Sequence, residues 1–350
     1  VSAIQKGIIK EDLESIYQAL KKNHMPGGIM EKAGYEHKTA LGGGFKYYLK
    51  NGYVPYPIPE GKFGGHQDGA SLTMEYAYQD WTLAQLAEKL GHKEDFDMFM
   101  QRSNNYKNVF DKNSGWMRPK DVNGIWLESF DPYEHQHGFI ESNGAQATWF
   151  VPHDINGLAE LMGGKEKAVE KLNNQFKVAE KLGFAAGNSH AQELHPEYRR
   201  VPINYGNQPS IQTAFIFNQL GRPDLTQYWS RKVIGKVFNG LSPATGYNGD
   251  EDQGLMGSLA VLMKIGLFQM NGGTENDPIY ELGSPIFDKI EIGLHPDYYT
   301  GEKFTILANN NGMDQWTIKN ASINGKALIG YSVRHSQLVK GAELELEMGE

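Results

Sequence analysis

The sequence predicts a mainly α-helical fold, a toroid or solenoid built from helix pairs and followed by a small antiparallel β module. Three observations predict it. Apolar residues recur at helical spacing through residues 1–277, and Gly or Pro separates the helices of each pair. From about residue 278 the apolar period shortens to that of strands. We therefore expect a helical domain with long loops at 1–277 and a β module packed on it at 278–350.

The first expected helix carries Leu13, Ile16, Tyr17 and Leu20 along one stripe. Residues 27–70 hold many Gly, Pro and Tyr without a period, which indicates a functional loop or a short hairpin excursion. The last expected helix is strongly apolar and is predicted to be deeply buried. Helices are expected at 10–23, 71–91, 93–111, 144–162, 165–183, 209–220, 224–239 and 252–267.

Strands are expected at 304–307, 315–318, 327–331 and 343–347. Asn324-Gly325 lies between two of them and is a strong hairpin signal, because both residues tolerate the positive φ of a tight turn.

Composition narrows the function classes. A formal charge of -8 disfavours nucleic acid and anionic membranes as partners, since both require a basic face. The 0 Cys exclude a disulfide framework, a thiolate metal site and a cysteine nucleophile. We find no apolar run long enough for a membrane span and no signal peptide within residues 1–10.

Two acidic sites about 110 residues apart carry the chemistry. Asp250-Glu251-Asp252 precedes an apolar helix, and the positive end of a helix dipole keeps carboxylates ionised, as a general base requires. The alternatives are plain helix capping and part of an Asp-x-Asp calcium loop. Glu141 lies near Phe139 and Trp149, whose apolar side chains would favour the protonated form that a general acid needs, with Asn143 capping the next helix. The alternative is a loop glutamate at a helix entry.

A third segment, 204–212, contains four amide side chains that offer oxygen ligands or hydrogen bonds to a sugar. Amides are equally common in turns, and that alternative stays open.

These segments together resemble glycoside hydrolase family 92, the calcium-dependent exo-α-mannosidases. The residues 141–154 are similar, without gaps, to the family's Glu-Gly-Asn-Ala-Trp-Gln-Tyr-x-Trp-x-Val-Pro-His-Asp, and Gly249-Asp250-Glu251-Asp252 matches its Gly-Asp-Glu-Asp. Four further motifs follow the family's order: Gly115 to Lys120, Gly206 to Gln227, Gly283 to Phe287 and Asn324 to Lys326.

The resemblance implies a β-sandwich domain followed by an (α/α)6 barrel, and hydrolysis that inverts the anomeric carbon. It implies Glu141 as general acid, with Asp252 and Asp250 activating the water. It further implies Ca²⁺ on O2 and O3 of the terminal mannose, with Gln208 and Gln212 as metal ligands. Substrate contacts are implied for Asn143, Gln146, Asn207 and Gln208.

Two departures bear on specificity. Asn207-Gln208 replaces the His-Glu of the α-1,2-specific members, and Ala145 replaces a family Trp. The family's N-terminal β-sandwich is absent from these residues, so a non-catalytic or incomplete sugar-binding unit is the rival reading. A different (α/α)-toroid enzyme, such as a phosphorylase, is a third. The expected partner is a mannose-containing glycan, and the family is mostly secreted or periplasmic.

Overall fold

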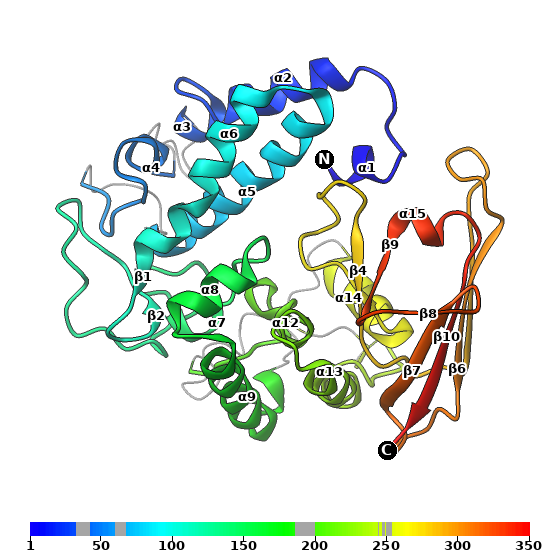
Figure 1. Cartoon of the computed structure of the whole chain (residues 1–350). Helices are drawn as coiled ribbons and strands as arrows, with labels where there is room; N and C mark the ends of the chain where they lie inside the picture. The colour runs from blue at the N-terminus through cyan, green and yellow to red at the C-terminus, as the bar shows by residue number, and fades with distance from the viewer. Residues whose placement is uncertain (33–42, 60–67, 186–199, 244, 247–248, 250–253) are drawn as a thin grey trace. The chain divides into compact units, whose positions relative to one another are not determined.

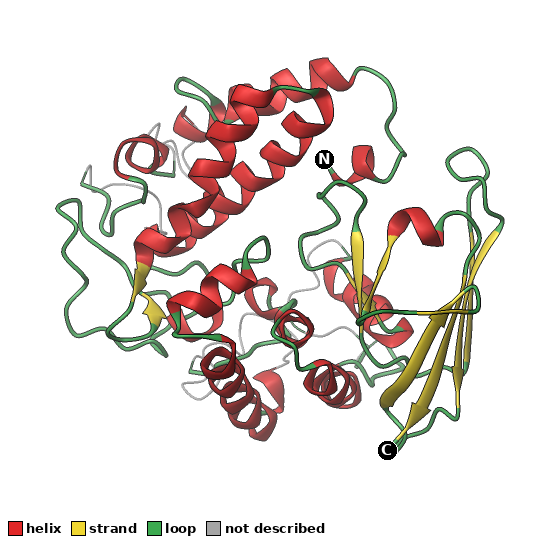
Figure 2. Cartoon of the chain, viewed as in Figure 1, coloured by secondary structure: helices red, strands yellow, loops and turns green. Residues whose placement is uncertain are grey.

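A computed structural model describes residues 1–32, 43–59, 68–185, 200–243, 245–246, 249 and 254–350 (Figure 1). The chain forms two compact units. The first comprises Val1, 10–164 and 199–202, and the second comprises 2–9, 165–198 and 203–350. This division differs from the one expected at residue 278, which stays a prediction. Most described elements before about residue 265 are helices, and most elements after it, all in the second unit, are strands (Figure 2).

The first unit is built around helix α5, Gly69–Leu90, which lies against α6, Lys93–Arg102 (Figure 1). One face of α5 carries small and apolar residues that are buried, as the period of the sequence predicts. The described residues of the segment 27–70 contain helical turns and no hairpin. The other elements of this unit are α2 (Leu13–Asn23), α3 (Ile29–Lys32), α4 (Phe45–Asn51), a 3-10 helix (Ser103–Val109), β1 (Phe110–Asp111), β2 (Trp116–Met117), α7 (Gly144–Ala147) and α8 (Ile155–Leu161).

A buried ion pair links α5 to α6 and α4. Arg102 lies 2.7 Å from Asp80, whose side chain is fully buried, and the Tyr48 hydroxyl donates to the same carboxylate at 2.6 Å. We expect Asp80→Asn to cost about 3–5 kcal/mol of unfolding free energy, because it leaves the Arg102 charge buried without its counter-ion. Denaturant unfolding measures the loss. The control is Asp97→Asn, in the exposed pair with Lys93, which should change stability by less than about 1 kcal/mol. Equal effects of the two variants would contradict the assignment.

The single helix expected at 144–162 is wrong. α7 ends at Ala147 and α8 begins at Ile155. Pro152 lies in the gap, and Asp154 caps α8 by accepting from the Gly157 N–H at 2.8 Å.

An aromatic cluster forms the core of the helical part of the second unit. The rings of Phe184, Tyr205, Phe217 and Trp229 all lie within 6.4 Å of the Phe176 ring, centroid to centroid. These buried rings join the helices of the unit to the amide-rich segment at 204–212. The elements are α1 (Ser2–Gln5), α9 (Lys165–Lys181), two 3-10 turns (Gly183–Ala185 and Gln208–Ser210), α12 (Thr213–Gln219), α13 (Pro223–Val237) and α14 (Leu255–Ile265). α14 is less buried than predicted, with Val261 largely exposed.

Two sheets complete the second unit. A three-stranded antiparallel sheet has the order β3-β4-β9, and a five-stranded sheet has the order β5-β6-β10-β7-β8 (Figure 2). Their strands are β3 (Leu267–Phe268), β4 (Ile279–Leu282), β5 (Lys289–Gly293), β6 (Lys303–Asn309), β7 (Thr317–Ile323), β8 (Lys326–Ala327), β9 (Ser332–Arg334) and β10 (Glu343–Gly349), with the short helix α15 at His335–Leu338.

The expectation of a purely antiparallel module needs correction. β10 lies between β6 and β7. It pairs antiparallel with β7 and parallel with β6. A parallel pair needs a long connection, and residues 310–342 supply it. The Asn324-Gly325 hairpin is confirmed, since both residues have positive φ, 50° and 73°.

Candidate active site

Glu141 lies in a tight turn at 138–142 of the first unit. Its φ of 46° is left-handed, a conformation that costs a side-chain-bearing residue energy and is concentrated at functional sites. The turn is held because the Gln136 N–H donates to the Ser142 carbonyl at 2.7 Å and residues 135 and 143 form an isolated bridge. The half-buried Glu141 side chain is thus presented from a rigid backbone.

The helix that follows is anchored by two amides. The Asn143 Oδ1 accepts from the Gln146 N–H at 3.0 Å, which confirms the predicted cap, and its Nδ2 donates to the Val201 carbonyl at 3.1 Å. The Gln146 Nε2 donates to the same carbonyl at 2.8 Å. Both amides therefore have structural roles, and their assignment as substrate contacts stays a prediction.

Two polar atoms beside Glu141 lack partners among the described residues. The Gln146 Oε1 and the Ser142 Oγ are both buried and accept or donate no hydrogen bond there. A buried polar atom without a partner costs free energy unless something else binds it, so both atoms are candidates to contact a polar ligand.

The sequence analysis did not identify Glu75 as a candidate site residue. Asp68, Ser71 and Glu75 lie at i, i+3 and i+7 along one face of α5, and the Ser71 Oγ accepts from the Ile140 N–H at 3.1 Å. Ser71 lies inside the helix and contacts Ile140, the residue before Glu141. Burial, together with the negative charges of Asp68 and Glu141, raises the pKa of Glu75 to about 7. The signal that could have found Glu75 was the recurrence of polar residues at helical spacing, Ser71 and Glu75, within an otherwise apolar predicted helix.

In the second unit, Asn207, Gln208 and Gln212 lie in one compact turn. The Asn207 side chain is fully buried and accepts from the Gln208 N–H at 3.0 Å. Nearby, the Tyr205 hydroxyl accepts from the Ala214 N–H at 3.1 Å, which ties the turn to the start of α12. These local hydrogen bonds confirm the turn alternative for this segment, and the assignment of its amides as ligands stays a prediction.

Asp250 and Asp252 lie outside the described residues, but the glycine that precedes them does not. The backbone of Gly249 packs on that of Gly206, so that a Cβ on Gly249 would lie 2.0 Å from the Gly206 oxygen. Its φ is also positive, 62°. Two glycines in contact thus join the start of the acidic segment to the amide turn at 206–208.

The donor set fits a hard cation in type. The Gln212 Nε2 donates to the Pro209 carbonyl at 3.0 Å, so the side-chain oxygen of Gln212 is the atom suited to bind a metal. The described part of the chain contains no group of three or more His, Asp or Glu side chains placed to hold a metal.

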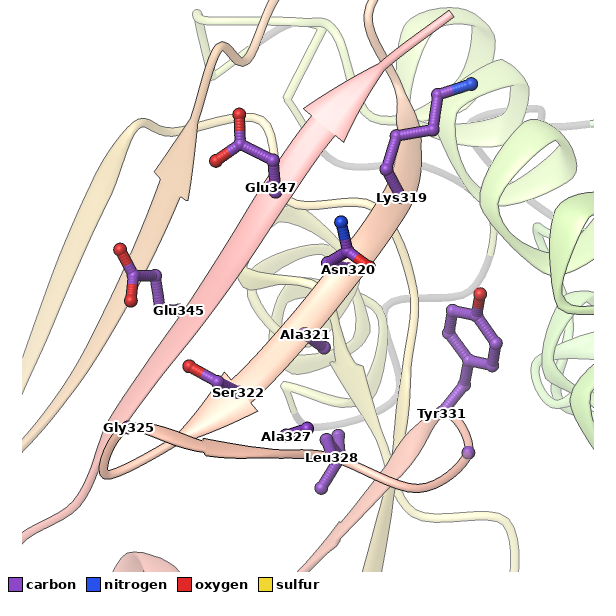
Figure 3. Close-up of a pocket in the computed structure, with 11 residues that line it drawn as sticks. Lys319, Asn320, Ala321, Ser322, Gly325, Ala327, Leu328, Tyr331, Glu345 and Glu347 are labelled. Carbon is purple, nitrogen blue, oxygen red and sulfur yellow. The ribbon is translucent and has the colours of Figure 1, made fainter.

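A polar groove of about 710 Å³ lies on the β module, lined by Asn320, Ser322, Tyr331, Glu345 and Glu347 among others (Figure 3). Its two carboxylates accept from the side chains of Asn309 and Asn310. Both carboxylates are solvated and already hydrogen-bonded, unlike a catalytic acid, and the groove is not the candidate active site.

The whole chain, residues 1–350, matches the glycosyl hydrolase family 92 catalytic domain. The chain belongs to this family. The family 92 structure of the inverting mannosidase BT2199 from Bacteroides thetaiotaomicron is 31% identical, with a TM-score of 0.80, over 99% of this chain and 44% of that one. The α-mannosidase BT3965 from the same organism, in complex with mannoimidazole, is 25% identical with a TM-score of 0.81, over 99% of this chain and 42% of that one.

A curated relative, an uncharacterized secreted glycosidase of Arthroderma benhamiae, is 28% identical over 309 residues, which are 80% of this chain and 35% of that protein. The family 92 domain described here therefore spans less than half the length of these relatives. Among its described residues, no helix is both long and apolar enough to cross a bilayer.

Proposed function

We propose that this family 92 domain belongs to an inverting exo-α-mannosidase that releases terminal α-linked mannose from glycans. The observation that carries the proposal is Glu141, held by its strained turn in a domain that matches the family over its whole length. The likeness to an inverting mannosidase at 31% identity supports the substrate class.

In the proposed reaction, Glu141 is the general acid. It donates its proton to the glycosidic oxygen as the bond from that oxygen to the anomeric carbon breaks. Phe139 and Trp149, which lie near Glu141 in the sequence, are both buried. The hydroxyl of the leaving sugar retains the transferred proton.

Asp252, aided by Asp250, is the proposed general base. It removes a proton from a water molecule whose oxygen attacks the anomeric carbon from the opposite face, and the configuration inverts. An inverting pair of carboxyls is expected roughly 6.5–9.5 Å apart, because the water must fit between the base and the sugar.

We propose Ca²⁺ as the cofactor, with Gln208 and Gln212 contributing amide oxygens. When bound, the ion would hold O2 and O3 of the terminal mannose and favour a distorted ring. The residues of this chain that would orient the same sugar are Asn143, Gln146, Asn207 and Gln208. Of these residues, Gln146 is the best placed to accept a hydrogen bond from the sugar, since its Oε1 is buried without a partner among the described residues.

We also propose the finer architecture, an (α/α)6 barrel over 1–277 with the β module of 278–350 packed on it. In the complete protein a β-sandwich domain would precede this barrel, as the resemblance implies and as the greater length of the solved relatives supports. The likeness to a secreted glycosidase supports action outside the cytoplasm.

Mannose release from α-1,2-, α-1,3-, α-1,4- and α-1,6-mannobiosides, with Ca²⁺ and with a chelator, tests this function. We expect release from at least one linkage and loss of that release with the chelator. NMR of the first product formed should show the β-anomer, since inversion of an α-mannoside yields it.

The linkage that is cleaved would also show what Asn207-Gln208 selects in place of His-Glu. Mannose binding by calorimetry without turnover, in the complete protein, would instead support the rival sugar-binding reading. Release that requires phosphate would identify a phosphorylase.

A further inference from the structure

Helix α5 presents a polar stripe to the turn that carries Glu141. Asp68 and Ser71 on this stripe are buried, and Glu75 is half-buried one helical turn beyond Ser71. The hydrogen bond from the Ile140 N–H to the Ser71 Oγ, 3.1 Å long, fixes the stripe against the turn. The residue before Glu141 is therefore held one helical turn from Glu75, and the charge of Glu141 acts on the Glu75 carboxyl.

The surroundings of Glu75 are unfavourable to its charge. The charged groups that act on it, among the described residues, are Asp68 from its own helix and Glu141 from the turn, and both are negative. Desolvation and these two charges raise the pKa of Glu75 to about 7. A half-buried carboxyl that faces no cation among the described residues costs stability, and such groups are concentrated at functional sites.

We propose that Glu75 is a positioning residue that acts through Glu141, forming with it a carboxyl pair that keeps one proton available for the leaving-group oxygen. This inference rests on the proposed role of Glu141 as general acid. Ionising both carboxyls at once is unfavourable because like charges repel, and the pair therefore retains a proton near neutral pH. Glu141 donates that proton to the glycosidic oxygen, and the pair regains one from solvent after the products leave.

The test compares two substrates that differ in their need for an acid. A mannobioside has a poor leaving group and needs protonation, whereas a 2,4-dinitrophenyl mannoside does not. At pH 7 we expect Glu75→Gln to lower kcat/KM by roughly tenfold or more on the mannobioside, the effect of about one pKa unit, and by less than about twofold on the aryl mannoside. The alkaline limb of the mannobioside pH profile should move to lower pH.

Glu88→Gln is the matched control, since Glu88 is an exposed glutamate on the same helix. It should leave both rates unchanged. Glu75→Asp keeps the carboxyl and should retain the pH profile of the wild type even if it is slower. In a Glu141→Gln background, Glu75→Gln should cause little further loss, because the two residues act as one unit.

An equal loss on both substrates, or a mannobioside pH profile that does not move, would overturn the inference and leave Glu75 a structural residue. Glu75→Gln with full mannobioside activity would overturn it as well. A wild-type protein that releases no mannose from any linkage would refute the proposed function instead, and the two failures are thus distinguishable.

Discussion

Replacing Glu141 with Gln is expected to lower kcat on α-mannobiosides by roughly 10²- to 10⁴-fold, the usual contribution of a general acid. Gln has nearly the same shape but carries no transferable proton, and the left-handed turn at 138–142 should keep its geometry. Steady-state kinetics on the linkage that the wild type cleaves measures the effect.

The same variant should lose far less activity on an aryl mannoside, because that leaving group departs without protonation. Circular dichroism and the unfolding midpoint should match the wild type. If Glu141→Gln hydrolysed mannobiosides at the wild-type rate, Glu141 could not be the acid. If Glu141→Gln lost equal activity on both substrates while its fold was unchanged, a role of Glu141 in substrate binding would explain the loss better.

Gly249→Ala is expected to lower activity by roughly 100-fold, although the changed side chain is a single methyl group. The new Cβ would lie 2.0 Å from the Gly206 oxygen and 2.3 Å from the Gly206 Cα, so one of the two backbone segments must move. Asp250 follows Gly249 directly and Asn207 follows Gly206. A displacement of about 1 Å between catalytic groups is enough for a loss of this size. Mannobioside kinetics and the unfolding midpoint measure the effect.

Gly221→Ala is the control for backbone strain. Gly221 also has a positive φ, 82°, but nothing lies within 4 Å of the position of its Cβ. The Gly221→Ala variant should therefore lose about 1–2 kcal/mol of unfolding free energy and keep its activity. If Gly249→Ala behaved in the same way, the contact between the two glycines would not organise the site.

Much of the local structure could be predicted because it depends on short-range pattern. The apolar stripe of Leu13 to Leu20 and the 22-residue helix α5 follow from side-chain spacing. The Asn324-Gly325 hairpin follows from the conformations that these two residues tolerate. The Asn143 cap was predictable for the same reason, since its hydrogen bond spans only three residues.

Other features depend on contacts between segments distant in sequence. The parallel pairing of β10 with β6 joins residues about 38 positions apart in the sequence, and no local pattern encodes it. The predicted helix at 144–162 failed for a local reason, because Pro152 and the Asp154 cap outweighed its apolar period.

By itself, the sequence determined the family, the acidic motifs and most helices, because each of these depends on short stretches of consecutive residues. The tertiary structure alone decided which groups meet. It places Glu75 of α5 beside a turn 66 residues later, and it packs Gly249 on Gly206. The pKa of a carboxyl and the space for a methyl group depend on the residues that surround them in the folded chain. The sequence alone does not show which distant residues come into contact.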